Sequence, residues 1–414
     1  MVFHIFYLIL YPRIANVSTN SEKVQKFKQM TKTNFKTAIF DYIGICVIVF
    51  LLGYILVFAS LNISFFNPLK QALDDFKMTD LYFELMQSGK EKELNNDIVL
   101  VDVTKLTNRN AIAKAINDVN SCSPKVLMID LIFERGSHDP AEDDSLIKAI
   151  EAGKEREILS AKLTDYNPNS KSFSNVTKSF FHEFIDVEWA YSNVDQKRPG
   201  GSIRKYSLSQ KLNDSIFFSM AYAAACAYKD IRPEIKDVSQ RLIVYDDTLL
   251  TISSDKILEN KKLLKDKLVI LGTLEEEADM HITPIGKLSG VKILAYSAIT
   301  YMNHKEIRSM GKCTSLLLAF VICLFCAWIG HKIRKKYKTF SSYCLKLFYF
   351  VLAAILVWIA FISFVHFDYD VDLLYPLLGL ALVEEGRIQY SSLVKTLCKH
   401  TKWNFVKKSI YNET

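Results

Sequence analysis

The sequence has 414 residues, of which 50% are hydrophobic and 23% are charged. This composition excludes a disordered chain, a collagen-like chain and a small disulfide-stapled domain. Residues 62–312 contain 34 Lys and Arg against 37 Asp and Glu, a net charge of −3, whereas the remaining residues contain 18 against 8, a net charge of +10. The total of +7 therefore belongs to the flanks, and it does not indicate a nucleic-acid-binding face, which needs basic residues clustered on a folded domain.

Uncharged apolar segments predict helices that span a membrane. The hydrocarbon core of a bilayer is about 30 Å thick and requires about 20 apolar residues in a helix. Three uncharged segments, at 42–61, 313–330 and 347–367, are close to this length. We place the spans at 37–61, 313–330 and 347–367. A fourth segment, 373–394, is apolar only as far as Val383 and then carries two glutamates. We expect it to cross as a fourth span, with a short re-entrant segment as the alternative.

Basic residues in the short connections predict the orientation of these spans, because they favour the cytoplasmic side. The N-terminal segment 1–36, the connection 331–346 and the tail 395–414 are basic, whereas the connection 367–372 contains three aspartates and no base. Residues 62–312 are therefore expected outside the cytoplasm. The first span is too long for a cleaved signal peptide, and Met30, just before a basic stretch, is an alternative start to Met1.

The segment between the first two spans predicts one α/β domain. Its apolar runs alternate between strand and helix periodicity, and a strand–helix–strand order favours parallel pairing. We expect a largely parallel or mixed sheet. In chain order the expected elements are a helix at 66–93, a strand at 97–103, a helix at 108–119, a strand at 126–133, a helix at 145–152, strands at 157–163 and 187–194 around a polar loop at 167–178, a helix at 214–228 capped by Asp214, a hairpin at 242–253, a strand at 268–272 and a helix at 290–302.

Two pairs of cysteines can each be interpreted in two ways. Cys122 and Cys226 are the two in the outer domain, where a disulfide is compatible with an oxidising compartment, but two buried free thiols are the favoured interpretation. Cys323 and Cys326 have the spacing of a metal or redox motif, yet their hydrophobic helix favours packing.

Carboxylates mark the candidate site. Asp102 and Asp130 end two strands that we predict to be adjacent, and the carboxyl edge of a parallel sheet is where α/β domains bind ligands. They are candidates to hold a cation or to act as acid and base, with capping of nearby loop amides as the alternative. Glu275 to Glu277, Asp279 and His281 form an acidic loop, for which a solvated loop is favoured over a metal site. No nucleophile elbow, phosphate-binding loop or zinc-binding motif is present, so we expect neither an enzyme nor a cofactor.

Several short blocks follow one another in a distinctive order: FKMTDLYF (76–83), a strand with Asp102, IDLIF (129–133), DSLIKA (144–149), IRK (203–205) and, most specifically, DMHITPIG (279–286) followed by GVKILA (290–295). The order of these blocks resembles the CHASE2 family, an extracytoplasmic sensory domain of bacterial signalling proteins. Two departures are Leu294, where the family often has His, and Lys205, in place of a second Arg. A third is that we expect no output domain of the usual kind after the last span.

The resemblance implies a sensory protein of the bacterial inner membrane that detects a small ligand or an envelope partner. It would relay this signal through its membrane helices to a separate output protein. A structural subunit or scaffold of a cell-envelope complex is the first alternative, and an extracytoplasmic metal-dependent hydrolase is a weaker one. No nucleic-acid partner is expected, and a homo-oligomer is left open. The candidate ligand-binding residues are Asp102, Asp130, Arg204, Asp279 and Thr283. For Arg204 a structural ion pair is the favoured alternative, and for Thr283 a role in shaping the turn.

Overall fold

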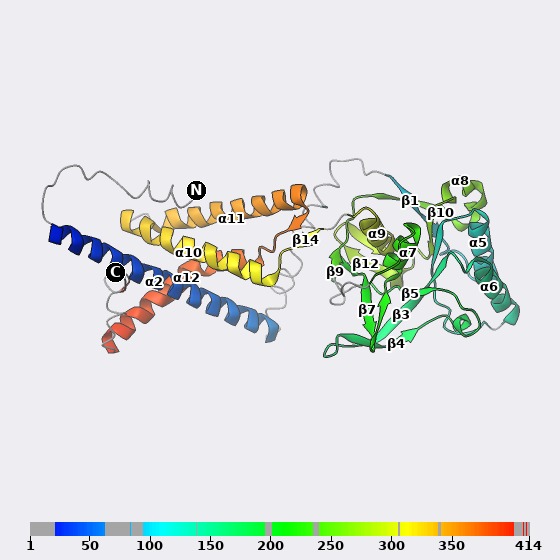
Figure 1. Cartoon of the computed structure of the whole chain (residues 1–414), viewed down its shortest axis with the longest axis horizontal. Helices are drawn as coiled ribbons and strands as arrows, with labels where there is room; N and C mark the ends of the chain where they lie inside the picture. Colours follow the sequence, from blue (N-terminus) through cyan, green and yellow to red (C-terminus); the bar gives the residue numbers. More distant parts are fainter. Residues whose placement is uncertain are drawn as a thin grey trace. The chain divides into compact units, whose positions relative to one another are not determined.

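The computed structural model describes residues 21–62, 83, 94–137, 139–194, 201–234, 240–304, 307–337, 341–400, 409 and 411, with side chains of the first helix described at 38–58. The chain divides into a helical unit (Met1–Asn67, Cys313–Ala354 and Leu374–Thr414) and an α/β unit (Pro68–Lys312 and Ile355–Leu373) (Figure 1). The helix predicted at 66–93 lies outside the described residues apart from Phe83. That residue is helical, and its buried ring lies 5.9 Å from the ring of Tyr245.

The α/β unit is built on a nine-stranded sheet with the order β10-β1-β11-β2-β3-β4-β7-β8, and β5 also pairs with β3. Strands β10, β1, β11, β2 and β3 are parallel, whereas β3–β4 and β7–β8 are antiparallel. The predicted α/β class with a largely parallel or mixed sheet is confirmed. The strands are β1 (Leu94–Asp102), β2 (Val126–Asp130), β3 (Glu157–Asn167), β4 (Ser172–Thr177), β5 (Trp189–Tyr191), β7 (Ser209–Leu212), β8 (Ser215–Phe218), β10 (Thr248–Ser253) and β11 (Leu268–Gly272).

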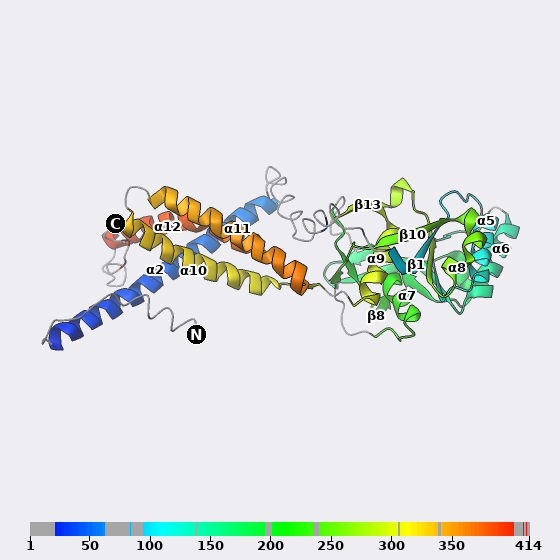
Figure 2. The same cartoon turned by 90° about the horizontal axis from the view of Figure 1, so that it is seen from above.

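Helices cover both faces of the sheet (Figures 1 and 2). In β1, Val99 and Val101 pack into the cluster beneath α5 (Arg109–Ser121) and α6 (Pro140–Gly153). Ile98 and Leu100 point the other way, into the cluster beneath α7 (Met220–Tyr228) and α9 (Gly290–Met302). Successive strand residues face opposite sides, so burial on both faces explains the continuously apolar strands. The short helices are α8 (Lys261–Leu264), η2 (Phe180–Glu183), η3 (Ser254–Lys256), η4 (Leu258–Asn260) and η5 (Glu277–Asp279).

Side-chain caps set the starts of the helices on the first face. Asn108 accepts a hydrogen bond from the Ala111 N–H at 2.8 Å, which confirms the helix predicted there. Asp139 caps α6 in the same way, and Pro140 occupies the first turn, where proline is tolerated. This helix therefore begins five residues before the predicted start at Ser145.

The helix predicted at 214–228 is wrong in its first third. Residues Ser215–Phe218 form β8, which turns back on β7 through Asn213 at φ +52°. Phe217 stacks on Trp189 with the ring centroids 4.8 Å apart. The helix starts only after Ser219, whose hydroxyl accepts a hydrogen bond from the Tyr222 N–H.

The hairpin predicted at 242–253 is also wrong. Strand β9 (Gln240–Leu242) pairs with β6 (Lys205–Ser207), whereas β10 runs parallel to β1 in the main sheet. The loop predicted at 167–178 contains a strand, β4. The β6–β9 pair borders a third cluster, on the faces of α7 and α9 that point away from the main sheet; its members include Ile203, Tyr206, Tyr222, Ile243, Tyr245, Ile293 and Tyr296.

Both cysteines of this unit are free and buried. Cys122 belongs to the cluster on the α5 and α6 face, and Cys226 to the third cluster beyond α7. The main sheet separates the two thiols, so the predicted pair of unbridged cysteines is confirmed.

Among the described residues, three helical segments are long and apolar enough to cross a membrane: Ala38–Phe58 of α2 (Ser21–Asn62), α10 (Lys312–Lys336) and α11 (Ser341–Phe367). The fourth predicted span belongs to α12 (Leu374–His400), a single continuous helix. Its apolar run ends at Glu384, which sets it apart from the other three.

Glycines let α12 pack closely in the helical unit. A Cβ atom on Gly386 would lie 2.4 Å from Val49 Cγ2 of α2, and one on Gly44 would lie 2.3 Å from the Tyr390 ring. On the other side, a Cβ on Gly379 would lie 2.8 Å from the Cys323 sulfur of α10. Since early residues of α2 meet late residues of α12, the two helices run antiparallel, and small residues at the contact allow this approach.

The connection between α11 and α12 is tied to the segment that leaves the α/β domain. Strand β14 (Arg308–Ser309) pairs in parallel with β15 (Tyr369–Asp370). The Arg308 N–H donates to the Asp368 carbonyl and the Met310 N–H to the Asp370 carbonyl, both at 2.8 Å. The residues that follow α11 and those that precede α10 are therefore held next to each other.

Candidate functional site

Three strand ends form the carboxyl edge of the sheet. Asp102 of β1 and Asp130 of β2 are both in register with Gly272 of β11. The prediction that the two aspartates end adjacent strands is wrong, because β11 lies between them. At a strand spacing of about 4.8 Å, their backbones are about 10 Å apart. All three positions face the side covered by α7 and α9, since they continue the alternation of Leu100, Ile270 and Met128.

Gly272 is required by the close approach of α9. A Cβ atom there would lie 2.6 Å from Val291 Cγ2 and 3.4 Å from the Cβ of Asp130. The absent side chain therefore lets the start of α9 rest on the strand end and leaves Asp130 beneath it.

Asp102 has a structural contact network. Its Oδ1 accepts hydrogen bonds from the Thr104 N–H at 2.9 Å and from the Thr104 hydroxyl at 2.5 Å. The same hydroxyl oxygen accepts a bond from the Leu274 N–H at 2.9 Å. Asp102 thus joins the loop after β1 to the loop after β11.

Asp130 and Asp279 are brought close to each other. Burial raises the pKa of Asp130 from 3.8 to about 6, and the neighbouring Asp279 carboxylate adds to the increase, while the Ser160 and Ser192 hydroxyls oppose it. Asp279 Oδ2 accepts a hydrogen bond from the Gly290 N–H at 2.8 Å, at the N-terminus of α9. This hydrogen bond anchors the Asp279 side chain at the start of α9.

The remaining two candidates lie elsewhere. Thr283 donates to the Gly286 carbonyl at 2.6 Å and closes the turn between β12 (Met280–Thr283) and β13 (Gly286–Ser289). Gly286 adopts φ +110°, a conformation that favours glycine. Arg204 follows Ile203 of the third cluster, and its guanidinium lies 3.4 Å from the Ser202 carbonyl. Of the five candidates, the structure therefore brings Asp130 near Asp279 at the sheet edge. Arg204 lies instead beside the third cluster, on the far side of α9 from the main sheet.

The acidic loop contributes one imidazole contact. His281 Nε2 lies 3.4 Å from Asp279 Oδ1, whereas Glu275 to Glu277 are exposed. No group of three or more His, Cys, Asp or Glu side chains within the described part of the chain is arranged to hold a metal ion. What the sheet edge offers is a carboxyl group that titrates near pH 6 beside a fixed carboxylate, which suits a proton or a cationic group.

We expect stability of the α/β unit to decrease as pH rises. The folded state raises the pKa of Asp130 to about 6 and burial raises that of Glu157 to about 7, so folding favours the protonated forms. The stability that protonation contributes is present below about pH 4 and is lost as pH rises through the folded values. The full-length protein should melt at a higher temperature at pH 5 than at pH 7.5, by an amount equivalent to about 1–3 kcal/mol.

Matched variants separate the two groups. Asp130→Asn should remove the part of the pH dependence that develops between about pH 4 and 6, and Glu157→Gln the part that extends up to about pH 7. Thermal unfolding of each variant from pH 4 to 8 would measure this. An unchanged pH profile in Asp130→Asn would contradict the assignment.

A second polar cluster was not predicted from the sequence. In the helical unit, Asp41 is 1% exposed, and its Oδ1 accepts hydrogen bonds from the Tyr390 hydroxyl at 2.8 Å and the Ser409 hydroxyl at 2.9 Å. Nearby on α12, Glu384 forms ion pairs with Arg334 of α10 and, at 2.8 Å, with Arg387. The only sequence signals were an aspartate at the edge of an apolar segment and a glutamate at the end of another.

Sequence comparison adds one finding. The family model of the CHASE2 domain matches residues 48–330, from within α2 to within α10. No curated protein and no solved structure matches the chain.

Proposed function

The chain belongs to the CHASE2 family, whose members are extracytoplasmic sensory domains, and on this basis we propose that it is a membrane-anchored signal-input protein. Its α/β domain would sense a small ligand or an envelope partner and act on a separate output protein through its membrane helices. The role proposed is binding rather than catalysis, because Asp102 and Asp279 are engaged in hydrogen bonds that organise loops and a helix start.

One observation carries this proposal: in chain order the sensory domain stands between α2 and α10, and these two helices pack against each other. The rings of Phe50 and Phe320 lie 6.2 Å apart, and those of Tyr42 and His331 lie 6.3 Å apart. A change that displaces the two ends of the domain would therefore shift this contact. Ligand binding can drive such a shift only if the ligand has different affinities for two states.

We propose that the ligand contacts the sheet edge at Asp130 and Asp279. Burial raises the pKa of Asp130 to about 6. An ionised Asp130 would favour a cationic group, and the proximity of Asp279 strengthens this preference. A perturbed carboxyl group at the carboxyl end of a parallel sheet supports the site without identifying the ligand.

We further propose four spans, with α12 as the fourth, in a bacterial inner membrane. Helix α12 packs along α2 from Gly53, beside Leu378 and Leu382, to Gly44, beside Tyr390. A helix that follows a membrane-spanning partner over this length crosses most of the same bilayer. Of its two glutamates, Glu384 forms ion pairs with Arg334 and Arg387, which lowers the cost of placing its charge near the membrane.

Natural cysteines test this topology. Cys313 is exposed at the start of α10, Cys344 is exposed near the start of α11, and Cys398 lies near the end of α12. In right-side-out vesicles, a membrane-impermeant maleimide should label Cys313 and leave Cys344 and Cys398 unlabelled until the membrane is permeabilised. Labelling of Cys398 before permeabilisation would show that α12 does not cross. Cys122, which is buried, serves as an internal control that reacts only after denaturation.

The signalling role is tested by capture of the tagged full-length protein from gently solubilised native membranes. We expect a kinase, cyclase, phosphodiesterase or transcription regulator to co-purify with the wild type. The Asp41→Ala variant, which alters the polar cluster between α2 and α12, should recover less of it. Recovery of structural envelope proteins only would favour the scaffold alternative, and recovery of the protein alone would overturn the relay to a separate output protein.

A further inference from the structure

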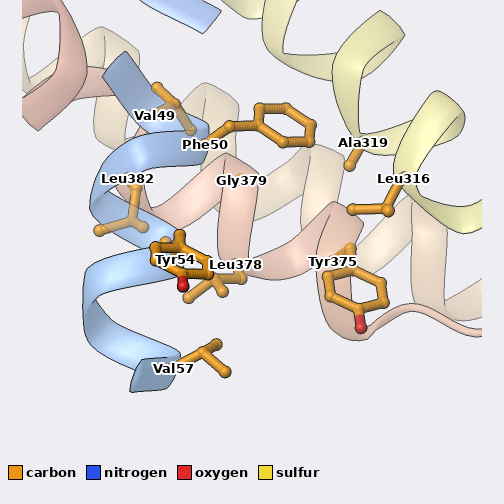
Figure 3. A pocket seen from close by; sticks show the side chains of 11 residues that line it. Val49, Phe50, Tyr54, Val57, Leu316, Ala319, Tyr375, Leu378, Gly379 and Leu382 are labelled. Carbon is orange, nitrogen blue, oxygen red and sulfur yellow. The ribbon is translucent and has the colours of Figure 1, made fainter. Parts of the chain in front are cut away.

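An apolar cavity of about 280 Å³ opens among α2, α10 and α12 (Figure 3). Helix α2 contributes Val49, Gly53 and Val57, and α12 contributes Leu378 and Leu382. Figure 3 shows Phe50, Leu316 and Leu378 around a common space, with the Tyr375 hydroxyl pointing away from it. We propose that this cavity binds one acyl chain of a phospholipid from the surrounding bilayer.

The depth and lining of the cavity exclude a polar occupant. Its inner wall includes Val49 and Ala319, each 2% exposed, and all its lining side chains apart from two tyrosines are aliphatic, phenyl or glycine. An apolar cavity of about 150 Å³ stays dry and accepts a molecule the size of benzene. The present cavity is about twice as large and requires an apolar occupant of corresponding length.

The mouth of the cavity faces the medium around the helices. Tyr54 is 69% exposed and Leu316 is 37% exposed, in contrast to the buried inner wall. Both belong to helices apolar enough to cross a membrane, so the medium at the mouth is the hydrocarbon of the lipid. Acyl chains are the molecules present there at the highest concentration, and this identifies the occupant.

Gly53 leaves part of the cavity open because it has no side chain. A Cβ atom at this position would meet Leu378 Cδ2 at 3.7 Å and Leu382 Cδ1 at 3.8 Å, which are ordinary contacts. A larger side chain can therefore enter the cavity without forcing α2 away from α12. The inference concerns only the membrane part of the chain and holds whether or not the domain relays a signal.

The experiment uses the full-length protein in phosphatidylcholine vesicles that contain a phosphatidylcholine with a photoreactive group near the end of one acyl chain. After irradiation, adducts are mapped by mass spectrometry. We expect adducts on the peptides that contain Gly53 to Val57 and Tyr375 to Leu382 at a higher yield than on the exposed surface around Phe350 of α11, which reports the general lipid contact.

Gly53→Leu should lower the yield in the cavity about tenfold, equivalent to about 1.4 kcal/mol, and leave labelling around Phe350 unchanged. Val47→Phe, on the exposed face of the same helix, is the matched control and should keep the wild-type pattern. Val57→Phe fills the cavity from its mouth and provides a second test if Gly53→Leu does not fold. Two results would overturn the proposal. One is equal labelling of the cavity and of the Phe350 surface that neither cavity-filling variant changes, which would mean boundary lipid only. The other is the absence of adducts in the cavity.

Discussion

Gly386→Leu is expected to separate α12 from α2 and to destabilise the helical unit by about 1–3 kcal/mol. The new side chain would begin 2.4 Å from Val49 Cγ2 and 3.4 Å from the backbone carbonyl oxygen of Ile45. A valine in a helix has one strongly preferred rotamer and a backbone oxygen cannot rotate away, so the helices must move apart. Thermal unfolding of the full-length protein in detergent micelles would measure the loss.

The matched control lies in the same helix pair. At Gly53, an added Cβ would be 3.7 Å or more from its nearest neighbours, so Gly53→Ala should unfold within about 0.5 kcal/mol of the wild type. If Gly386→Leu also unfolded with the wild type, the close packing of α2 and α12 would be refuted.

Asp41→Ala is expected to release Ser409 and Tyr411 from their packing in the helical unit. The substitution leaves the Tyr390 and Ser409 hydroxyls without their shared acceptor, and each buried unsatisfied group costs about 1–3 kcal/mol. Tyr411, 4% exposed, lies in the same region, with its ring 6.0 Å from that of Tyr390. Hydrogen exchange or limited proteolysis of the purified protein should show loss of protection at Ser409 and Tyr411.

Two weaker variants calibrate this result. Ser409→Ala removes only the bond from the tail, and Tyr390→Phe removes only the bond between the helices. Both should reduce protection less than Asp41→Ala, and Tyr390→Phe should retain the packing on Gly44. Full protection of Ser409 and Tyr411 in Asp41→Ala would contradict the role of Asp41 as the anchor.

Local sequence patterns predicted most of the central elements. Strands β1, β2 and β11 are short apolar runs, and α9 is a mostly apolar segment that begins at Gly290, so each element could be predicted from its own residues. The order of strands was not, because hydrophobic periodicity says nothing about which strands are neighbours: β11 enters between β1 and β2 although it is far from both in sequence. Strand β8 was missed because SIFF continues into the alanine-rich run of α7 without a charged residue; Ser219 alone marks the boundary.

For the candidate site, too, single residues could be predicted from the sequence but their spatial arrangement could not. Asp102 and Asp130 were recognisable as residues that end buried strands, and Asp279 as part of a distinctive block. The position of Gly272 between Asp102 and Asp130, and the influence of Asp279 on the pKa of Asp130, depend on tertiary structure. Asp41 was not recognised because its partners are 349 and 368 positions away along the chain.

The position of β11 has a consequence for how the protein is made. In the main sheet, β1 pairs only with β10 and β11, the last two strands of that sheet in chain order. The first strand of the domain can therefore gain its first partner only when β10, which ends at Ser253, has been synthesised and moved to the same compartment, and its second only when residues up to Gly272 have followed. Non-local pairing of this kind slows folding and exposes apolar strand edges meanwhile. Biogenesis of the domain therefore places its greatest demand on chaperones during translocation, before the second membrane helix has emerged.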